Sequence, residues 1–276
     1  MKRLVAFDLD GTLAESKQAI DPEMAALLER LSHLAIIAVI SGGDWPQFRQ
    51  QLVGSLPASF DTTRLFLLPT CGTKLYRCAD DWQPVYIDSL SEDARTRILA
   101  AFDGALAQAG IADEHTWGKR IEDRGSQITF SALGQKAPLE AKLAWDPDFS
   151  KRQRLQQALA AALPGQSVRI GGSTSIDITQ AGVDKAYGMR KLAQFALVDF
   201  AEMIFIGDAL YPGGNDAPVR EAGIDSIAVR DTSETKRVIE TLIYSLPVRQ
   251  VLADGASPEF AGQCPPARAQ MGALNG

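Results

Sequence analysis

A short apolar stretch that runs directly into two carboxylates is the feature that most restricts how this chain can fold. The predicted strand Leu4–Asp8 is followed by Asp10, with glycine and threonine next in the chain. Alternation along a strand would point Asp8 and Asp10 the same way. One carboxylate can attack phosphorus, and the one two residues on can move the proton of the leaving or entering oxygen. The pattern predicts phosphoryl transfer.

A second apolar stretch and a lysine supply groups that could hold a phosphate. Ala35–Ile40 reads as a strand that ends in Ser41, Gly42 and a further glycine. The Ser41 hydroxyl and nearby backbone N–H groups could bind phosphate oxygens at a helix start. Lys185 lies near the start of a predicted helix, where its charge could neutralise a phosphate and an aspartate.

A third apolar stretch, Met203–Gly207, runs into Asp208 and then into a glycine turn with Asn215 and Asp216. These hard oxygen ligands suit Mg²⁺, which keeps several waters and needs only one or two protein carboxylates. Parallel strands bring their carboxyl ends to one edge of a sheet, where ligands of open α/β folds bind. We therefore expect one magnesium-dependent site at this edge.

These motifs resemble, in order, those of the haloacid-dehalogenase-like phosphotransferase superfamily. DLDGT matches its first motif, Ser41 the second, Lys185 the third, and GDALYPGGND the fourth. The resemblance implies that Asp8 is the nucleophile and forms an aspartyl phosphate. It implies that Asp10 is the general acid and base, and that its backbone carbonyl binds Mg²⁺. Asp208 would be a direct metal ligand, and Asp216 a direct or water-mediated one.

Residues 1–245 are more closely similar to the eukaryotic-type phosphomannomutases and related sugar-phosphate phosphatases with an inserted cap. The similarity rests on PGGND, IEDRGSQITFSALG and GGSTSIDITQAGVDKAYG. It implies that the cap binds a sugar phosphate through Arg124, Ser175 and Asp177. The chain departs from that pattern at Gln135 and Lys142, where arginines are expected.

The alternation of apolar strands and helical stretches predicts an α/β fold, with a Rossmann-like parallel-sheet core and an inserted α+β cap. We expect core residues at 1–83 and 185–246, the cap at 84–184, and a loosely structured tail at 247–276. Further core strands are predicted at Leu65–Leu68 and Ser226–Val229.

Two predicted strands of the cap alternate polar and apolar side chains. QITFS, starting at Gln127, and SIDIT, starting at Ser175, each present one apolar and one polar face. The apolar face can pack on the predicted helices Ser91–Ala109 and Lys151–Leu163. The polar face could close over the catalytic edge and bind sugar hydroxyls, or it could be solvated.

We expect a cytoplasmic enzyme that is a monomer or homodimer, and the composition agrees with a soluble enzyme. The chain has 276 residues, 46% of them hydrophobic, and a formal charge of −6, which disfavours nonspecific nucleic-acid binding. Its first apolar run is cut by Asp8, too early for a signal peptide or membrane span. Three cysteines without paired spacing do not indicate a zinc site.

The sequence therefore predicts a phosphoric monoester hydrolase that uses Mg²⁺ and acts on a sugar phosphate. A phosphomannomutase-like transfer between sugar positions is the first alternative, because the cap pattern resembles the mutases. A non-catalytic phosphosugar-binding protein is the second.

Overall fold

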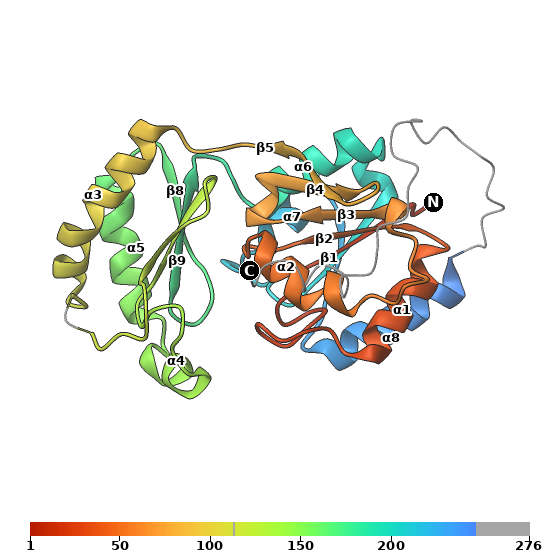
Figure 1. Cartoon of the computed structure of the whole chain (residues 1–276), viewed down its shortest axis with the longest axis horizontal. Helices are drawn as coiled ribbons and strands as arrows, with labels where there is room; N and C mark the ends of the chain where they lie inside the picture. The colour runs from red at the N-terminus through yellow and green to blue at the C-terminus, as the bar shows by residue number, and fades with distance from the viewer. Residues whose placement is uncertain (113, 247–276) are drawn as a thin grey trace, which may run out of the picture. The chain divides into compact units, whose positions relative to one another are not determined.

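The computed structural model describes residues 1–112 and 114–246 and divides them into two compact units (Figure 1). The first unit combines Met1–Ile87 with the chain from Asp184 onward, and the second is Asp88–Val183. The predicted tail, 247–276, lies outside the described residues. The α/β fold class with an inserted α+β unit is confirmed, because one unit holds a mainly parallel sheet and the other an antiparallel one.

The first unit is built on a seven-stranded sheet of order β11-β10-β1-β2-β3-β4-β5. Neighbouring strands from β11 to β3 run parallel, and β4 and β5 add an antiparallel hairpin. The strands are β1 (Leu4–Phe7), β2 (Ile36–Ile40), β3 (Leu65–Leu68), β4 (Lys74–Cys78), β5 (Trp82–Ile87), β10 (Met203–Gly207) and β11 (Asp225–Ala228). The five predicted core strands are all present, with ends shifted by one residue at most, whereas β4 and β5 were not predicted.

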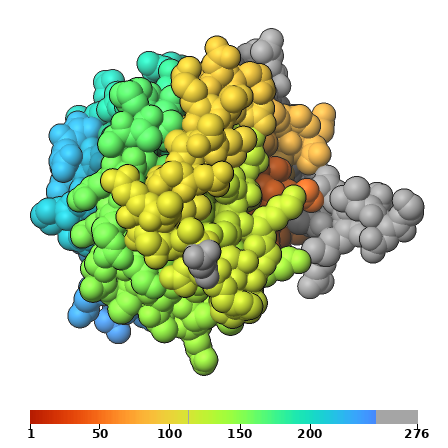
Figure 2. All heavy atoms as spheres, turned by 90° about the vertical axis from the view of Figure 1, so that its left-hand side faces the viewer, coloured from red at the N-terminus to blue at the C-terminus, as the bar shows by residue number. Residues whose placement is uncertain are grey.

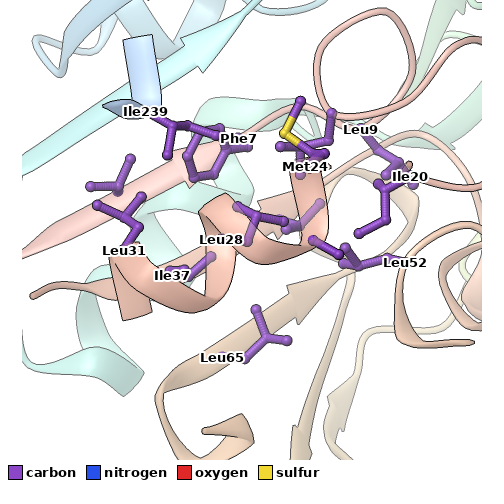
Figure 3. Close-up of a cluster of buried hydrophobic side chains, with 14 of the residues drawn as sticks. Phe7, Leu9, Ile20, Met24, Leu28, Leu31, Ile37, Leu52, Leu65 and Ile239 are labelled. Atoms are coloured by element: carbon purple, nitrogen blue, oxygen red, sulfur yellow. The ribbon is translucent and has the colours of Figure 1, made fainter. Parts of the chain in front are cut away.

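Both faces of the central strands are buried, because side chains of β1, β2 and β3 alternate between two apolar clusters. Val5 and Phe7 of β1 join one cluster, which Figure 3 shows, and Leu4 and Ala6 join the other. A parallel sheet covered on both faces needs such apolar strands.

Helices supply the partner surfaces of both clusters. On the face in Figure 3, α1 (Pro22–Ser32), α2 (Trp45–Gln51) and α8 (Thr232–Ser245) contribute side chains such as Met24 and Ile239. On the other face, α6 (Lys185–Ala196) and α7 (Ala217–Glu221) do so. Short 3₁₀ turns complete the unit: η1 (Val53–Ser55), η2 (Thr62–Arg64), η3 (Thr70–Gly72) and η4 (Phe200–Glu202).

The second unit is a four-stranded antiparallel sheet of order β6-β7-β9-β8 with helices packed on its apolar face. Its elements are α3 (Glu92–Ala109), β6 (Ile121–Asp123), β7 (Gln127–Ser131), α4 (Leu139–Trp145), α5 (Ser150–Ala162), β8 (Gln166–Ile170) and β9 (Ser175–Gln180). Ile128 and Phe130 of β7 pack with Phe102 of α3 and Leu159 of α5. Figure 2 views the helical side, with α3 in yellow and α5 in green.

Within the described part of the chain, no helix combines the length and the apolar character that crossing a membrane requires.

Candidate active site

Three parallel strands bring polar groups to the carboxyl edge of the core sheet. Asp8 follows β1, Ser41 follows β2, and Asp208 follows β10. In the register, Phe7 lies opposite both Val39 and Ile206, so these three strand ends are level. The predicted meeting of the motifs at one sheet edge is thus what the strand pairing produces.

Lys185 joins the aspartates of the first and fourth motifs. It is the first residue of α6 and is buried, and its Nζ donates to Asp8 Oδ1 and to Asp216 Oδ1, at 2.5 Å each. Asp216 also accepts from the Ala209 backbone N–H through Oδ2, at 3.0 Å. One ammonium group therefore fixes two carboxylates that lie more than two hundred residues apart in the chain.

Burial and crowding of carboxylates raise the pKa of Asp8 and that of Asp208. Burial is the largest cause for Asp8, whose pKa is raised well above its ordinary range against the opposing charge of Lys185. Burial, then the nearby Asp216, also raises the pKa of Asp208. Burial alone would lower the pKa of Lys185, but the charges of Asp216 and Asp8 together outweigh burial and raise it. The ionised site therefore carries more negative charge than the protein balances.

The donor set fits a divalent cation with oxygen ligands. One carboxylate oxygen from each of Asp8, Asp208 and Asp216 lies within 4.8 Å of the others. Three carboxylates and one ammonium leave a charge of −2 when all are ionised, which one Mg²⁺ would neutralise. Hard oxygen donors of this kind are the ligands that Mg²⁺ prefers.

Glycines let the backbone approach these aspartates closely. Gly11 has φ +85°, and a Cβ there would lie 2.7 Å from Asp208 Oδ2. The buried Thr12 next to it donates its hydroxyl to Asp208 Oδ1 at 3.3 Å. The glycine and threonine of DLDGT thus shape the loop that supports Asp208.

Asp10 has hydrogen-bond partners different from those of Asp8. β1 ends at Phe7, and the chain then turns, with the Gly11 N–H donating to the Ala14 carbonyl. Asp10 accepts from the Lys17 backbone N–H at 2.8 Å and from Gln47 Nε2 at 2.6 Å.

Ser41 is buried at the end of β2, and its hydroxyl accepts from the Gly43 N–H at 3.1 Å. That bond leaves the Ser41 hydroxyl proton to donate. The half-buried Gly42 lies between them. The N-terminus of α2, which follows this loop, is already capped by Asp44, which accepts from the Trp45 N–H at 2.8 Å. Asp44 also pairs with Lys74 Nζ at 2.6 Å.

The predicted substrate-binding residues of the cap lie in the second unit, on or near the polar face of its sheet. Asp177 of β9 accepts from Thr129 Oγ1 at 2.8 Å and Gln127 Nε2 at 2.9 Å. Burial raises the pKa of Asp177, and the charge of Arg124 opposes that effect. Ser175 lies 3.4 Å from Ser131, hydroxyl to hydroxyl.

Two charged residues of this face, Glu122 and Arg169, were not predicted from the sequence. Strand register places Glu122, Thr129, Asp177 and Arg169 opposite one another in a row across β6, β7, β9 and β8. Arg124 donates to Glu122 Oε2 at 2.7 Å. The alternation of polar residues in QSVRI, which forms β8, was the available signal for Arg169.

Gln135, where the resemblance leads us to expect an arginine, donates to Ser131 Oγ at 3.1 Å. Lys142, at the other departure, lies on α4 and is half-buried. Gln47 and Gln51 of α2 are further residues that sequence patterns did not indicate. Both contact Asp10.

A sequence model of eukaryotic phosphomannomutase matches residues 24–245. Among curated proteins, human phosphomannomutase 1 is 28% identical over 248 residues, which cover 86% of this chain and 91% of that protein. A probable phosphomannomutase from Caenorhabditis elegans is 26% identical over 259 residues, covering 89% of this chain and 97% of the relative.

Solved structures share the fold at low sequence identity. IMP-bound Plasmodium falciparum IMP-nucleotidase superposes with a TM-score of 0.67 and 16% identity, covering 88% of this chain and 68% of that one. A haloacid dehalogenase-like hydrolase from Bacteroides thetaiotaomicron gives a TM-score of 0.56 and 16% identity, covering 88% of this chain and all of the other.

Proposed function

This chain belongs to the eukaryotic phosphomannomutase family, and on that premise we propose that it is a magnesium-dependent phosphatase of sugar phosphates. The resemblance to the haloacid-dehalogenase-like superfamily is confirmed, and the chain is an enzyme of that superfamily. The observation that carries the proposal is the contact of one buried lysine with two carboxylates beside a third.

In the proposed reaction, Asp8 attacks the phosphorus of the substrate through a carboxylate oxygen. A bond forms between that oxygen and phosphorus while the ester P–O bond breaks, and Asp10 gives its proton to the leaving oxygen. A water then attacks the aspartyl phosphate and passes its proton to Asp10, which frees Asp8 and inorganic phosphate. Lys185 holds Asp8 in place and offsets charge, and Ser41 donates to a phosphate oxygen.

Asp8, Asp208, Asp216 and the Asp10 backbone carbonyl would hold Mg²⁺. Once bound, the ion would supply positive charge beside the phosphoryl oxygens. In the cap, Arg124, Ser175 and Asp177 would bind the sugar phosphate.

The charge of the cap supports hydrolysis over a mutase reaction. A mutase binds a bisphosphate in two orientations, so its cap must grip a second phosphate with cationic side chains. On the polar face of this cap, Arg124 is paired with Glu122, and Arg169 lies opposite Asp177 in the strand register. Two acids thus accompany the two arginines. Gln135 adds no charge, and Lys142 lacks the guanidinium fork.

A phosphomannomutase reaction is the second candidate, which the names of the relatives favour. The third, a sugar-phosphate binding protein without catalysis, leaves the buried cluster of Asp8, Asp216 and Lys185 unexplained. Such a charged cluster is costly to bury unless each charge is paired.

Product analysis separates the three candidates. The protein is incubated with mannose 6-phosphate or glucose 6-phosphate, Mg²⁺ and a trace of hexose 1,6-bisphosphate, and free phosphate and hexose 1-phosphate are followed. We expect phosphate release to exceed isomer formation and to vanish in Asp8→Asn. Faster isomer formation would establish the mutase, and binding without either product would establish the binding protein. Unchanged turnover by folded Asp8→Asn would refute the aspartyl mechanism.

A further inference from the structure

Two glutamines of α2 hold the carboxylate of Asp10. Gln51 Nε2 donates to Asp10 Oδ1 at 3.1 Å, and Gln47 Nε2 donates to Asp10 Oδ2 at 2.6 Å. Positions i and i+4 lie on one face of a helix, so both amides reach the same group. The Lys17 backbone N–H adds a second bond to Oδ1, at 2.8 Å.

These contacts make the two oxygens of Asp10 different. A carboxylate oxygen has about two acceptor positions. Among the described residues, Oδ1 receives two donors, from Lys17 and Gln51, whereas Oδ2 receives one, from Gln47. Oδ2 therefore keeps a lone pair that can carry a proton.

The two glutamines are held differently. Gln51 is 1% exposed, and its Nε2 also donates to the Gln18 carbonyl at 2.8 Å, so turning this amide would cost two hydrogen bonds. Gln47 is half-buried. Its side-chain amide fills the space that a side chain at position 43 would need. A Cβ on Gly43 would lie 2.1 Å from Gln47 Oε1. The second glycine after Ser41 thus gives Gln47 room to reach Asp10.

We propose that Gln47 and Gln51 are positioning residues for the acid–base step, with Gln51 anchoring Asp10 Oδ1 and Gln47 orienting Oδ2 as the oxygen that exchanges the proton. This inference rests on the proposed function, because it assigns Asp10 the proton of the leaving oxygen. The proton passes from Oδ2 to the ester oxygen as the P–O bond breaks, and water returns one to Oδ2 in the second half of the reaction. Neither glutamine gains or loses a proton.

Two small esters of different leaving-group basicity test the role of Gln47. Benzyl phosphate releases a basic alkoxide that needs a proton, whereas p-nitrophenyl phosphate releases a stable anion. The value of kcat/KM depends on the steps from substrate binding up to departure of the leaving group. In Gln47→Met we expect kcat/KM for benzyl phosphate to fall about tenfold and that for p-nitrophenyl phosphate to change less than about twofold, since general acid catalysis serves the basic leaving group.

Gln50→Met is the matched control, because Gln50 is an exposed glutamine on the same helix, and it should leave both values unchanged. Equal losses on both esters in Gln47→Met would overturn the inference, because a structural defect does not select by leaving group. No loss on either ester would also overturn it.

Failure of the proposed function gives a different result. In that case the wild-type protein would cleave neither ester, or Asp8→Asn would cleave both. If the wild type cleaves both esters in an Asp8-dependent way and Gln47→Met is not selective, the inference alone fails.

Discussion

At the scale of single residues, the site depends on an excess of carboxylates around one ammonium group. Lys185 bonds to Asp8 and Asp216 with all three side chains buried. Asp208 stands beside them, and in the described part of the chain it has no ion pair with a second lysine. Charges buried in this way are stable only when paired. The metal-free site therefore holds more carboxylates than the one ammonium group can pair, and the stability of the protein should depend on pH and on Mg²⁺.

We expect the thermal stabilisation by Mg²⁺ to be larger at about pH 8 than at about pH 5. The pKa values of Asp8 and Asp208 are raised in the folded protein, so above the ordinary aspartate pKa of about 3.9 the folded state binds more protons than the unfolded state. Stability of the metal-free protein then falls as pH rises through this window. Mg²⁺ binds the ionised carboxylates and removes that loss.

Melting curves with Mg²⁺ and with chelator, at both pH values, measure the effect. Asp208→Asn should lose most of the Mg²⁺-dependent increase in Tm, whereas Asp225→Asn, an exposed aspartate, should keep it. An increase in Tm that is equal at the two pH values would contradict the assignment.

Sequence patterns predicted the residues of the cluster because each follows an apolar strand or opens a helix. They could not predict the partners of Asp10. Gln47 and Gln51 belong to a helix whose role depends on how the loop after Phe7 turns, and no local pattern in the chain encodes that turn.

At the scale of elements, the placement of α6 decides where Lys185 lies. Gly188, one turn into this helix, packs against the turn η3, where a Cβ would lie 2.4 Å from Ile40 Cδ1 and 2.8 Å from the Cys71 carbonyl oxygen. In that turn, Gly72 has φ +81° and its own Cβ position lies 2.3 Å from Gly188 Cα. Two glycines thus bring helix and turn into backbone contact.

Gly188→Ala should destabilise the protein by about 1–3 kcal/mol, as overpacking does in close-packed interiors, and should lower kcat by moving Lys185. Gly104→Ala is the matched control, because Gly104 lies in the helix α3 with nothing within 4 Å of its Cβ position. That change should stabilise by about 0.5–1 kcal/mol through helix propensity. Urea denaturation of the two variants measures both signs, and a stabilising Gly188→Ala would disprove the contact.

One element that sequence patterns missed is the hairpin of β4 and β5. β5 contains Pro84 and has no buried residue, which fits an edge strand but gives no apolar signal. The pairing also shifts register between Leu75 and Tyr76. Trp45 of α2 stacks on Tyr76, with ring centroids 4.1 Å apart. This contact joins distant segments and cannot be predicted from spacing.

At the scale of the whole molecule, the residues proposed for catalysis and those proposed for sugar binding lie in two units with separate cores. The first unit holds Asp8, Lys185 and Asp208, and the second holds Arg124 and Asp177. The first unit has two apolar clusters of its own and the second has one, so changes in one core need not unfold the other. Chemistry and recognition of the sugar should therefore be separable by mutation.

Asp177→Asn should raise KM for the true sugar phosphate at least several-fold while leaving kcat/KM for p-nitrophenyl phosphate near the wild-type value. The amide keeps one acceptor for Thr129 and Gln127 but loses the charge near Arg124. Interactions with the remote part of a substrate affect only substrates that have that part. Steady-state kinetics on both esters would show it, and equal losses would mean that Asp177 supports the fold instead.

The order of the strands has a consequence for synthesis of the protein. β1 is paired on one side by β2 and on the other by β10, which begins at Met203. A ribosome therefore completes the whole second unit before it makes the strand that covers the open side of β1. Until then a nascent chain carries an apolar strand with an unpaired edge, the kind of surface that joins other chains. Slowing translation between the codons for residues 88 and 203 should thus increase aggregation more than slowing it after residue 207.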